Sequence, residues 1–151
     1  MFVMHLPYYI ATLAFSILGV SILHETRRVY SKGETLSLRL SIKWWILDCE
    51  WTIIVILSSL HRLWPLPFEK TTVLVCGLAL LAIGVATISA GVMEFCSLRK
   101  ISGMEVSKLI TTGIYRWSRN PQFLGLYLSL LGIALLGHSG YALLLTIVAI
   151  I

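Results

Sequence analysis

The chain has 151 residues, of which 58% are hydrophobic and only 13% are charged. Soluble domains carry about a quarter charged residues, so this composition excludes an ordinary soluble domain and indicates a membrane protein. The net charge of +5 does not indicate a nucleic-acid partner, because the lysines and arginines lie in two loops beside apolar segments, where they set topology and meet anionic lipid head groups.

The first apolar segment, residues 6–24, is long enough to cross ~30 Å of hydrocarbon. No lysine or arginine precedes it and no small-residue cleavage pattern follows it, so we predict a retained helix and not a signal peptide. A cationic loop over residues 25–43 comes next. Its segment 36–40 is expected to lie flat on the bilayer surface.

The second predicted span, residues 44–64, has tryptophans at both ends, as is typical of membrane interfaces. Asp48 and Glu50 near its start have two interpretations. They form a substrate or proton site within the membrane, or they lie at head-group depth and pair with Lys43 or Arg39, which is the interpretation we favour.

The third predicted span, residues 71–95, places Gly77, Gly84 and Gly91 seven residues apart on one helical face. Small residues at this spacing let neighbouring helices approach closely, so we predict a packing role for them. Glu94 ends this span. We favour a solvated position for it over a role in orienting a ligand.

A second cationic loop over residues 96–119 leads to a fourth span, residues 122–137, and a fifth apolar run, residues 141–151. The predicted fold is therefore an all-α polytopic membrane protein with about five transmembrane helices, in a single domain over residues 1–151. The fifth run rises only ~16 Å, about half a bilayer, so we expect the C-terminal part of the protein to be missing.

The two cationic loops hold five lysines or arginines each, whereas the opposite side holds only Arg62 and Lys70. The positive-inside rule then predicts an N-terminus outside and the second loop, about residues 97–121, on the cytoplasmic side. Cys49, Cys76 and Cys96 share no ligand spacing, so we predict no metal site and no disulfide framework.

The second loop carries the chemistry. Gly113 and the pair Asn120-Pro121 indicate turns, and a helix is expected to start just after the proline. Free backbone N–H groups at a helix start attract anionic and polar ligand groups. These features indicate a ligand site where the chain meets the membrane.

This loop resembles the Gly-x-Tyr-x-x-x-Arg-His-Pro-x-Tyr-x-Gly signature of the isoprenylcysteine carboxyl methyltransferases and the related phospholipid methyltransferases. The matching residues are Gly113, Tyr115, Arg119, Asn120, Pro121, Phe123 and Gly125. Asn120 replaces the histidine of the signature and Phe123 its second tyrosine. With the flanking residues the resemblance covers about 19 positions, residues 107–125.

The resemblance implies S-adenosyl-L-methionine as cofactor and S-adenosyl-L-homocysteine as product. By position it implies these cofactor-binding residues: Lys100, Ser107, Lys108, Leu109, Ile110, Tyr115, Arg119, Asn120, Pro121, Gln122 and Phe123. For Leu109 and Ile110 the alternative is simple packing, and for Tyr115 and Trp117 it is an interfacial belt. No catalytic residue can be named, because the sulfonium is already a good leaving group and the enzyme chiefly positions and shields the reactants.

The leading hypothesis is an integral-membrane methyltransferase that acts on the C-terminal carboxylate of a prenylated cysteine or a similar lipid-like acceptor. The alternatives are a phospholipid N-methyltransferase, an NADPH-dependent sterol reductase-like enzyme and, in a different class, a non-enzymatic membrane scaffold. The expected partners are the lipid-like or prenylated substrate and membrane lipids. The sequence does not predict the oligomeric state or rank the methyl acceptors.

Overall fold

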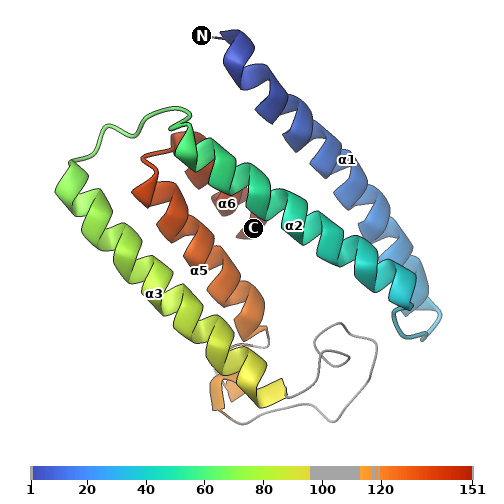
Figure 1. Ribbon diagram of the computed structural model, residues 1–151. Coiled ribbons are helices and arrows are strands. Elements are labelled where there is room, and N and C mark those ends of the chain that lie inside the picture. The colour runs from blue at the N-terminus through green and yellow to red at the C-terminus, as the bar shows by residue number, and fades with distance from the viewer. Residues whose placement is uncertain (1, 96–112, 117, 119, 151) are drawn as a thin grey trace. The chain divides into compact units, whose positions relative to one another are not determined.

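The computed structural model describes residues 2–95, 113–116, 118 and 120–150, and every named element in them is a helix (Figure 1). In chain order these elements are α1 (Phe2–Ser31), α2 (Leu38–Leu60), α3 (Lys70–Phe95), the 3-10 helix η1 (Gly113–Arg116), α5 (Pro121–Leu136) and α6 (Gly140–Ile150). The predicted all-α fold is confirmed.

Within the described residues, two helical segments are long and apolar enough to cross a membrane, His5–Ser31 in α1 and Lys70–Glu94 in α3. The apolar helices α5 and α6 are shorter. These helices fit a membrane protein, while the number of about five spans stays a prediction. The described residues divide into two compact units, the first holding residues 2–52 and residue 95, and the second the described parts of 53–94 and 113–150.

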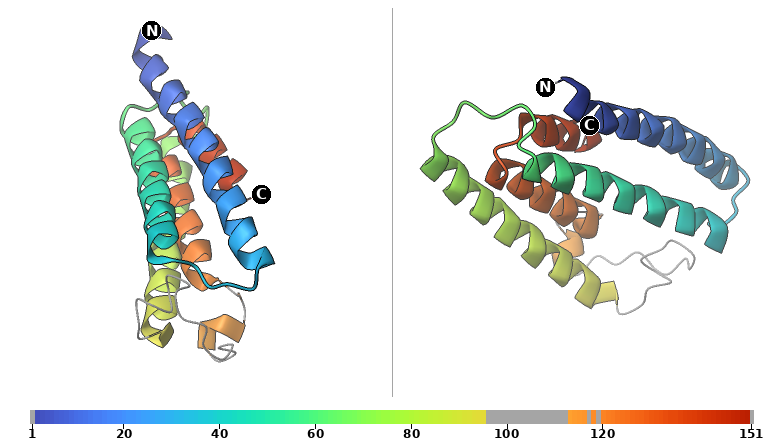
Figure 2. Two further views of the ribbon diagram at one scale, coloured as in Figure 1. Left: turned by 90° about the vertical axis from the view of Figure 1, so that its right-hand side faces the viewer. Right: turned by 45° about the horizontal axis from the view of Figure 1, so that its top comes forward.

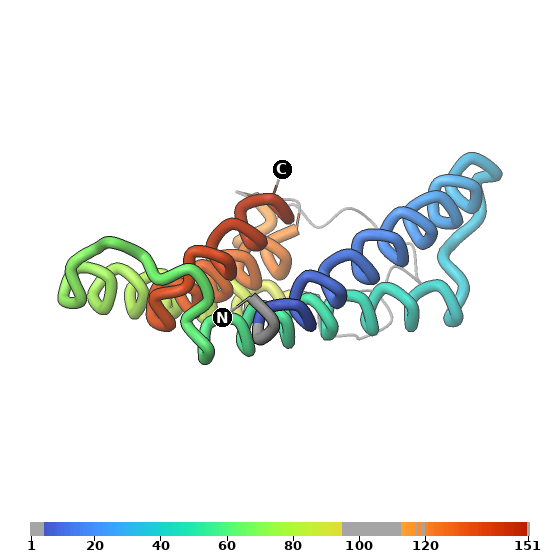
Figure 3. The backbone as a smooth tube through the Cα atoms, turned by 90° about the horizontal axis from the view of Figure 1, so that it is seen from above, coloured from blue at the N-terminus to red at the C-terminus, as the bar shows by residue number. Residues whose placement is uncertain are grey.

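In the first unit, α1 and the beginning of α2 form a hairpin joined by residues 32–37 (Figures 2 and 3). Ile22 of α1 packs with Leu40 and Leu47 of α2 in a buried apolar cluster. Further along the pair, the rings of Phe15 and Trp51 lie with their centroids 4.4 Å apart. These contacts run in opposite order along the two helices, so the helices are antiparallel.

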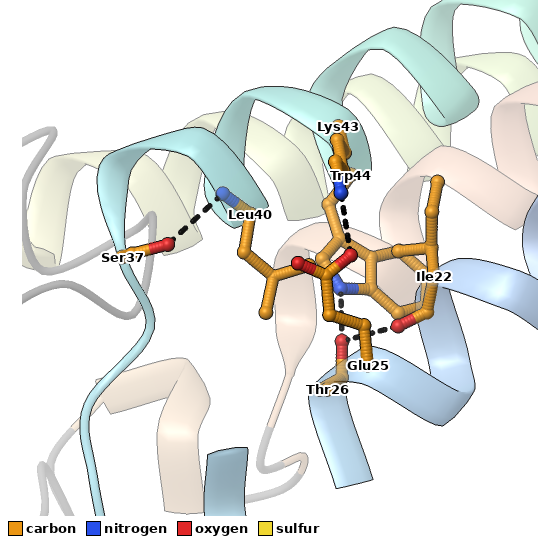
Figure 4. Close-up of polar contacts among 7 residues, drawn as sticks. All are labelled: Ile22, Glu25, Thr26, Ser37, Leu40, Lys43 and Trp44. Carbon is orange, nitrogen blue, oxygen red and sulfur yellow. Dashed lines mark hydrogen bonds and ion pairs between the residues drawn. The ribbon is translucent and has the colours of Figure 1, made fainter. Parts of the chain in front are cut away.

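Polar contacts close to the loop that connects α1 and α2 add to this packing (Figure 4). The indole Nε1 of Trp44 donates to Thr26 Oγ1 at 2.9 Å, and that hydroxyl donates to the carbonyl of Ile22 at 2.8 Å. Lys43 pairs with Glu25, and both side chains are about half exposed, so the ion pair contributes little stability. Pairing of Lys43 with Asp48 or Glu50 is therefore wrong, because a glutamate on the facing helix takes its place.

The helix boundaries differ from the hydropathy-based spans. α1 continues through the first cationic residues to Ser31, and α2 already begins at Leu38, where the Ser37 hydroxyl accepts a hydrogen bond from the Leu40 N–H. Leu40 is almost fully buried against α1, so residues 38–40 form the first turn of α2 and not a separate segment, while a position at the bilayer surface stays a prediction. Hydropathy marks only the apolar stretch, whereas helical hydrogen bonding continues beyond it.

In the second unit, α3 and α5 lie side by side and antiparallel (Figure 1), and glycines allow their backbones to touch. A Cβ on Gly84 would come within 2.6 Å of the Gly125 carbonyl oxygen, and a Cβ on Gly125 equally close to that of Gly84. Gly77 and Gly132 form a second such pair one heptad away, with corresponding distances of 3.1 and 2.7 Å. The predicted packing role of these glycines is confirmed.

The other end of this unit is closed by the loop after α2 and the turn before α6. Leu66 N–H donates to the His138 carbonyl at 3.1 Å, and Gly140 N–H donates to the Trp64 carbonyl at 2.8 Å. The buried Ser139 hydroxyl donates to the Leu63 carbonyl at 2.9 Å. These bonds satisfy backbone groups that would otherwise be buried without partners. From this turn, α6 packs Tyr141, Ala142, Leu145 and Thr146 inward.

Candidate functional site

The start of α5 is set by proline. Pro121 occupies the first turn of the helix, where its missing N–H costs nothing. Asn120 precedes it with φ −135° and ψ 68°; its side chain makes no capping hydrogen bond and is exposed. The predicted helix start just after Asn120 is confirmed, and the Asn120 side chain is free of a structural task in capping this helix.

Gly91, near the end of α3, lets the start of α5 pack closely. A Cβ at Gly91 would lie 3.2 Å from the Pro121 Cγ and 3.2 Å from the Gln122 Cγ. Pro121 is almost fully buried there. This contact continues the line of Gly77 and Gly84 and brings the end of α3 against the first turn of α5.

The 3-10 helix η1 lies against the same end of α3 (Figure 1). It begins at Gly113, whose φ of +54° is a left-handed conformation that favours glycine. A Cβ at this position would overlap the carboxylate of Glu94. Glycine at this position therefore allows both the left-handed turn of the backbone and the close packing of the Glu94 carboxylate.

Tyr115 of η1 is buried, and its hydroxyl donates to the Gly91 carbonyl at 3.3 Å. Burial raises the pKa of the Tyr115 phenol, the nearby Glu94 carboxylate raises it further, and the neighbouring Gln122 amide opposes this shift. The phenol thus stays neutral and keeps its proton for the Gly91 carbonyl. Tyr115 therefore lies near two other polar side chains, Glu94 and Gln122.

These three residues form the Glu94–Tyr115–Gln122 cluster. Glu94 Oε2 and Gln122 Nε2 are both buried, and neither has a hydrogen-bond partner of normal geometry among the described residues. Burying such groups without a partner costs roughly 1–3 kcal/mol each, more for a charged group. The favoured solvated position of Glu94 holds only in part, because the residue is half-buried, its carboxylate lies against Gly113 and its Oε2 atom is buried.

The remaining predicted site residues are placed as follows. Phe123 is exposed on the first turn of α5. The residues Lys100, Ser107, Lys108, Leu109, Ile110 and Arg119, together with Trp117, lie outside the described residues. The structure thus brings Tyr115, Pro121 and Gln122 together. Asn120 and Phe123 are their neighbours in the sequence, and both side chains are exposed.

Sequence reasoning considered Glu94 and Gln122 separately and did not pair them. The signal was present in the spacing. Glu94 follows Gly91 by three residues, which places it on the same side of the helix as the glycine face. Since that face was predicted to meet another helix, a carboxylate on it was a candidate for burial.

Comparison with known proteins agrees with the resemblance at the level of the family. The family model described as phospholipid methyltransferase matches residues 72–151, a range that runs from the first turn of α3 through η1, α5 and α6. No curated protein and no solved structure matches the chain. The match contains the whole Glu94–Tyr115–Gln122 cluster and more than half of the sequence, so the chain belongs to the phospholipid methyltransferase family of membrane enzymes.

Proposed function

We propose that this protein transfers a methyl group from S-adenosyl-L-methionine to a lipid-like acceptor within the membrane. The observation that carries the proposal is the family match over residues 72–151, since a methyltransferase needs a methyl donor. When bound, S-adenosyl-L-methionine supplies a methyl group on a positively charged sulfur, which leaves as a neutral thioether once the acceptor attacks.

The residues at the start of α5 fit such a ligand. The cluster holds two buried polar atoms without a hydrogen-bond partner of normal geometry among the described residues, Glu94 Oε2 and Gln122 Nε2, so it has capacity for a polar ligand. The exposed ring of Phe123 on the next position offers a face for a sulfonium. The exposed Asn120 side chain offers an amide for hydrogen bonds.

The chain's contribution to the reaction is positioning and exclusion of water. The close packing of α3 on α5 holds the first turn of α5 against η1, and the Tyr115 hydrogen bond to Gly91 fixes η1 in turn. A rigid frame of this kind holds a donor in line with an acceptor. Apolar helices around it let a lipid-like acceptor approach from the bilayer while keeping bulk water away.

Two acceptors follow from the two related families, the carboxylate of a prenylated cysteine and the amine of a phospholipid. A radiolabelled methyl donor distinguishes them when the purified protein is offered phosphatidylethanolamine or a farnesylated cysteine analogue. Radioactive methyl groups recovered in the lipid extract of one of the two reactions identify the acceptor used. Absence of transfer to either by a folded protein that binds the donor would contradict a lipid-like acceptor of these two classes.

We also propose a multi-pass arrangement in which the loop before α5 faces the cytoplasm, as the distribution of lysine and arginine indicates. Cysteines introduced at the exposed positions Glu34 and Glu69, in a background without native cysteines, test this orientation in intact cells. A membrane-impermeant maleimide should label Glu69→Cys from outside and Glu34→Cys only after permeabilisation. The reverse pattern would contradict the proposed orientation.

A further inference from the structure

The buried atoms of the Glu94–Tyr115–Gln122 cluster have complementary hydrogen-bonding needs. Glu94 Oε2 is an acceptor, with negative charge when the carboxyl is ionised, and Gln122 Nε2 is a donor. Neither has a hydrogen-bond partner of normal geometry among the described residues. The nearby Tyr115 hydroxyl donates its proton to the Gly91 carbonyl, and the Gln122 amide lies close enough to its oxygen to influence the phenol. A ligand that satisfies both must present a donor and an acceptor close together.

The geometry restricts the donor further. One oxygen of the Glu94 carboxylate, Oε1, is packed against Gly113, whereas Oε2 is the buried oxygen without a partner in the described residues. A planar guanidinium prefers two parallel bonds to both carboxylate oxygens, whereas an ammonium acts as a compact point charge. Oε2 is the one Glu94 oxygen that is buried without a partner among the described residues, and a compact ammonium suits a single oxygen.

Charge points the same way. A buried carboxylate is stabilised by an opposite charge far more than by a neutral group. The Gln122 amide is neutral and donates, so it suits an oxygen of a carboxylate or phosphate. Gly91 and Gly113 give these two side chains room to lie beside Tyr115, so the site is built by the backbone of α3, η1 and α5 together.

We propose that the Glu94–Tyr115–Gln122 cluster binds a primary ammonium group through Glu94 and an oxyanion of the same ligand through Gln122. Two ligands share this chemistry. The methyl donor carries an ammonium and a carboxylate on one carbon, and an amine phospholipid carries an ammonium two carbons from its phosphate ester. The first source rests on the proposed function, and the second does not require it.

The test uses the full chain in nanodiscs of phosphatidylcholine, a lipid without an N–H group. Three probes are titrated by calorimetry: S-adenosyl-L-homocysteine, its analogue with the ammonium replaced by hydrogen, and short-chain phosphatidylethanolamine. Each is compared between wild type, Glu94→Gln and the matched control Glu69→Gln, which makes the same change at an exposed glutamate at the other end of the spanning segment.

We expect Glu94→Gln to weaken binding of at least one ammonium probe tenfold or more, while Glu69→Gln leaves it unchanged. If S-adenosyl-L-homocysteine is the affected probe, the deaminated analogue should bind wild type and Glu94→Gln equally. If wild type binds no S-adenosyl-L-homocysteine but binds phosphatidylethanolamine in a Glu94-dependent manner, the ammonium site stands and the proposed cofactor fails.

Equal binding of both ammonium probes to wild type and Glu94→Gln would overturn the proposal, and so would binding of neither probe to wild type. A cation supplied by the chain itself would give the first of these results. Should Glu94→Gln not fold, wild type alone decides the question through thermal unfolding. The ammonium probes must then raise the melting temperature more than the deaminated analogue, and equal or absent shifts would overturn the proposal.

Discussion

At the scale of single residues, the site depends on a glycine with a left-handed backbone. Gly113 has φ +54°, and a side chain there would collide with the Glu94 carboxylate. Gly33, in the hairpin of the first unit, has φ +70° with nothing within 4 Å of a hypothetical Cβ. The two positions therefore separate backbone strain from side-chain collision.

Gly113→Ala should destabilise the protein more than Gly33→Ala. Both substitutions add the left-handed strain of about 1–2 kcal/mol for a residue with a Cβ, but only Gly113→Ala must also displace Glu94. Thermal unfolding followed by circular dichroism in detergent measures the difference. Equal melting temperatures for the two variants would contradict the close packing of Glu94 against Gly113.

Tyr115 gives a prediction with a defined pH dependence. Its pKa is raised above the ordinary value of 10.0, so the folded protein keeps a phenol proton that the unfolded chain loses above about pH 10. The stability of the folded state is therefore unaffected by this group below pH 10 and falls as the pH rises above it. Tyr115→Phe lacks this titration.

The melting temperature of wild type should accordingly fall more steeply above pH 10 than that of Tyr115→Phe. At neutral pH, Tyr115→Phe should be less stable by about 0.5–1.5 kcal/mol, because the Gly91 carbonyl loses its hydrogen bond. Parallel pH slopes for the two proteins would show that Tyr115 is not in the environment described.

At the scale of secondary-structure elements, α3 and α5 are held by backbone contact at reciprocal glycine pairs. The Gly84–Gly125 pair has the shorter distances, with a Cβ on either residue 2.6 Å from the carbonyl oxygen of the other. Such contact brings the two helices into dense van der Waals packing, which is the main attraction between helices in lipid. The start of α5, and with it the site, depends on this spacing.

Gly84→Leu should separate α3 from α5 and destabilise the protein, since inserted methylenes in a packed interface typically cost about 1–3 kcal/mol. Ala86→Leu, two residues away on an exposed part of the same helix, is the matched control and should leave the melting temperature nearly unchanged. The same loss of stability in both variants would rule out a specific contact at Gly84.

At the scale of the whole molecule, composition and hydropathy predicted the helical class and the starting points of α3, α5 and α6 within a residue or so. Glycine spacing predicted which face of α3 packs, because a missing side chain has a direct steric meaning. The end of α1 and the start of α2 were not predicted, since both helices continue past the apolar stretch that hydropathy detects. At its other end α2 stops at Leu60, before the predicted end at residue 64.

The environment of charged groups was the part that the sequence did not show. Lys43 pairs with Glu25, which lies 18 positions earlier in the chain, in place of the nearby carboxylates on its own helix. The Glu94 carboxylate lies against Gly113 of η1, an element that follows it by almost twenty residues. Both outcomes depend on tertiary contacts, and neither residue type nor spacing alone reports them.

The central claim is that the start of α5 and the preceding η1 bind the methyl donor. Calorimetric titration of S-adenosyl-L-homocysteine into the full chain tests it most directly, with Asn120→Ala and Phe123→Leu as variants. Both side chains are exposed, and Asn120 does not cap α5, so these changes should leave the fold intact. We expect micromolar binding to wild type that either change weakens several-fold. A folded wild-type protein that does not bind S-adenosyl-L-homocysteine would contradict the claim.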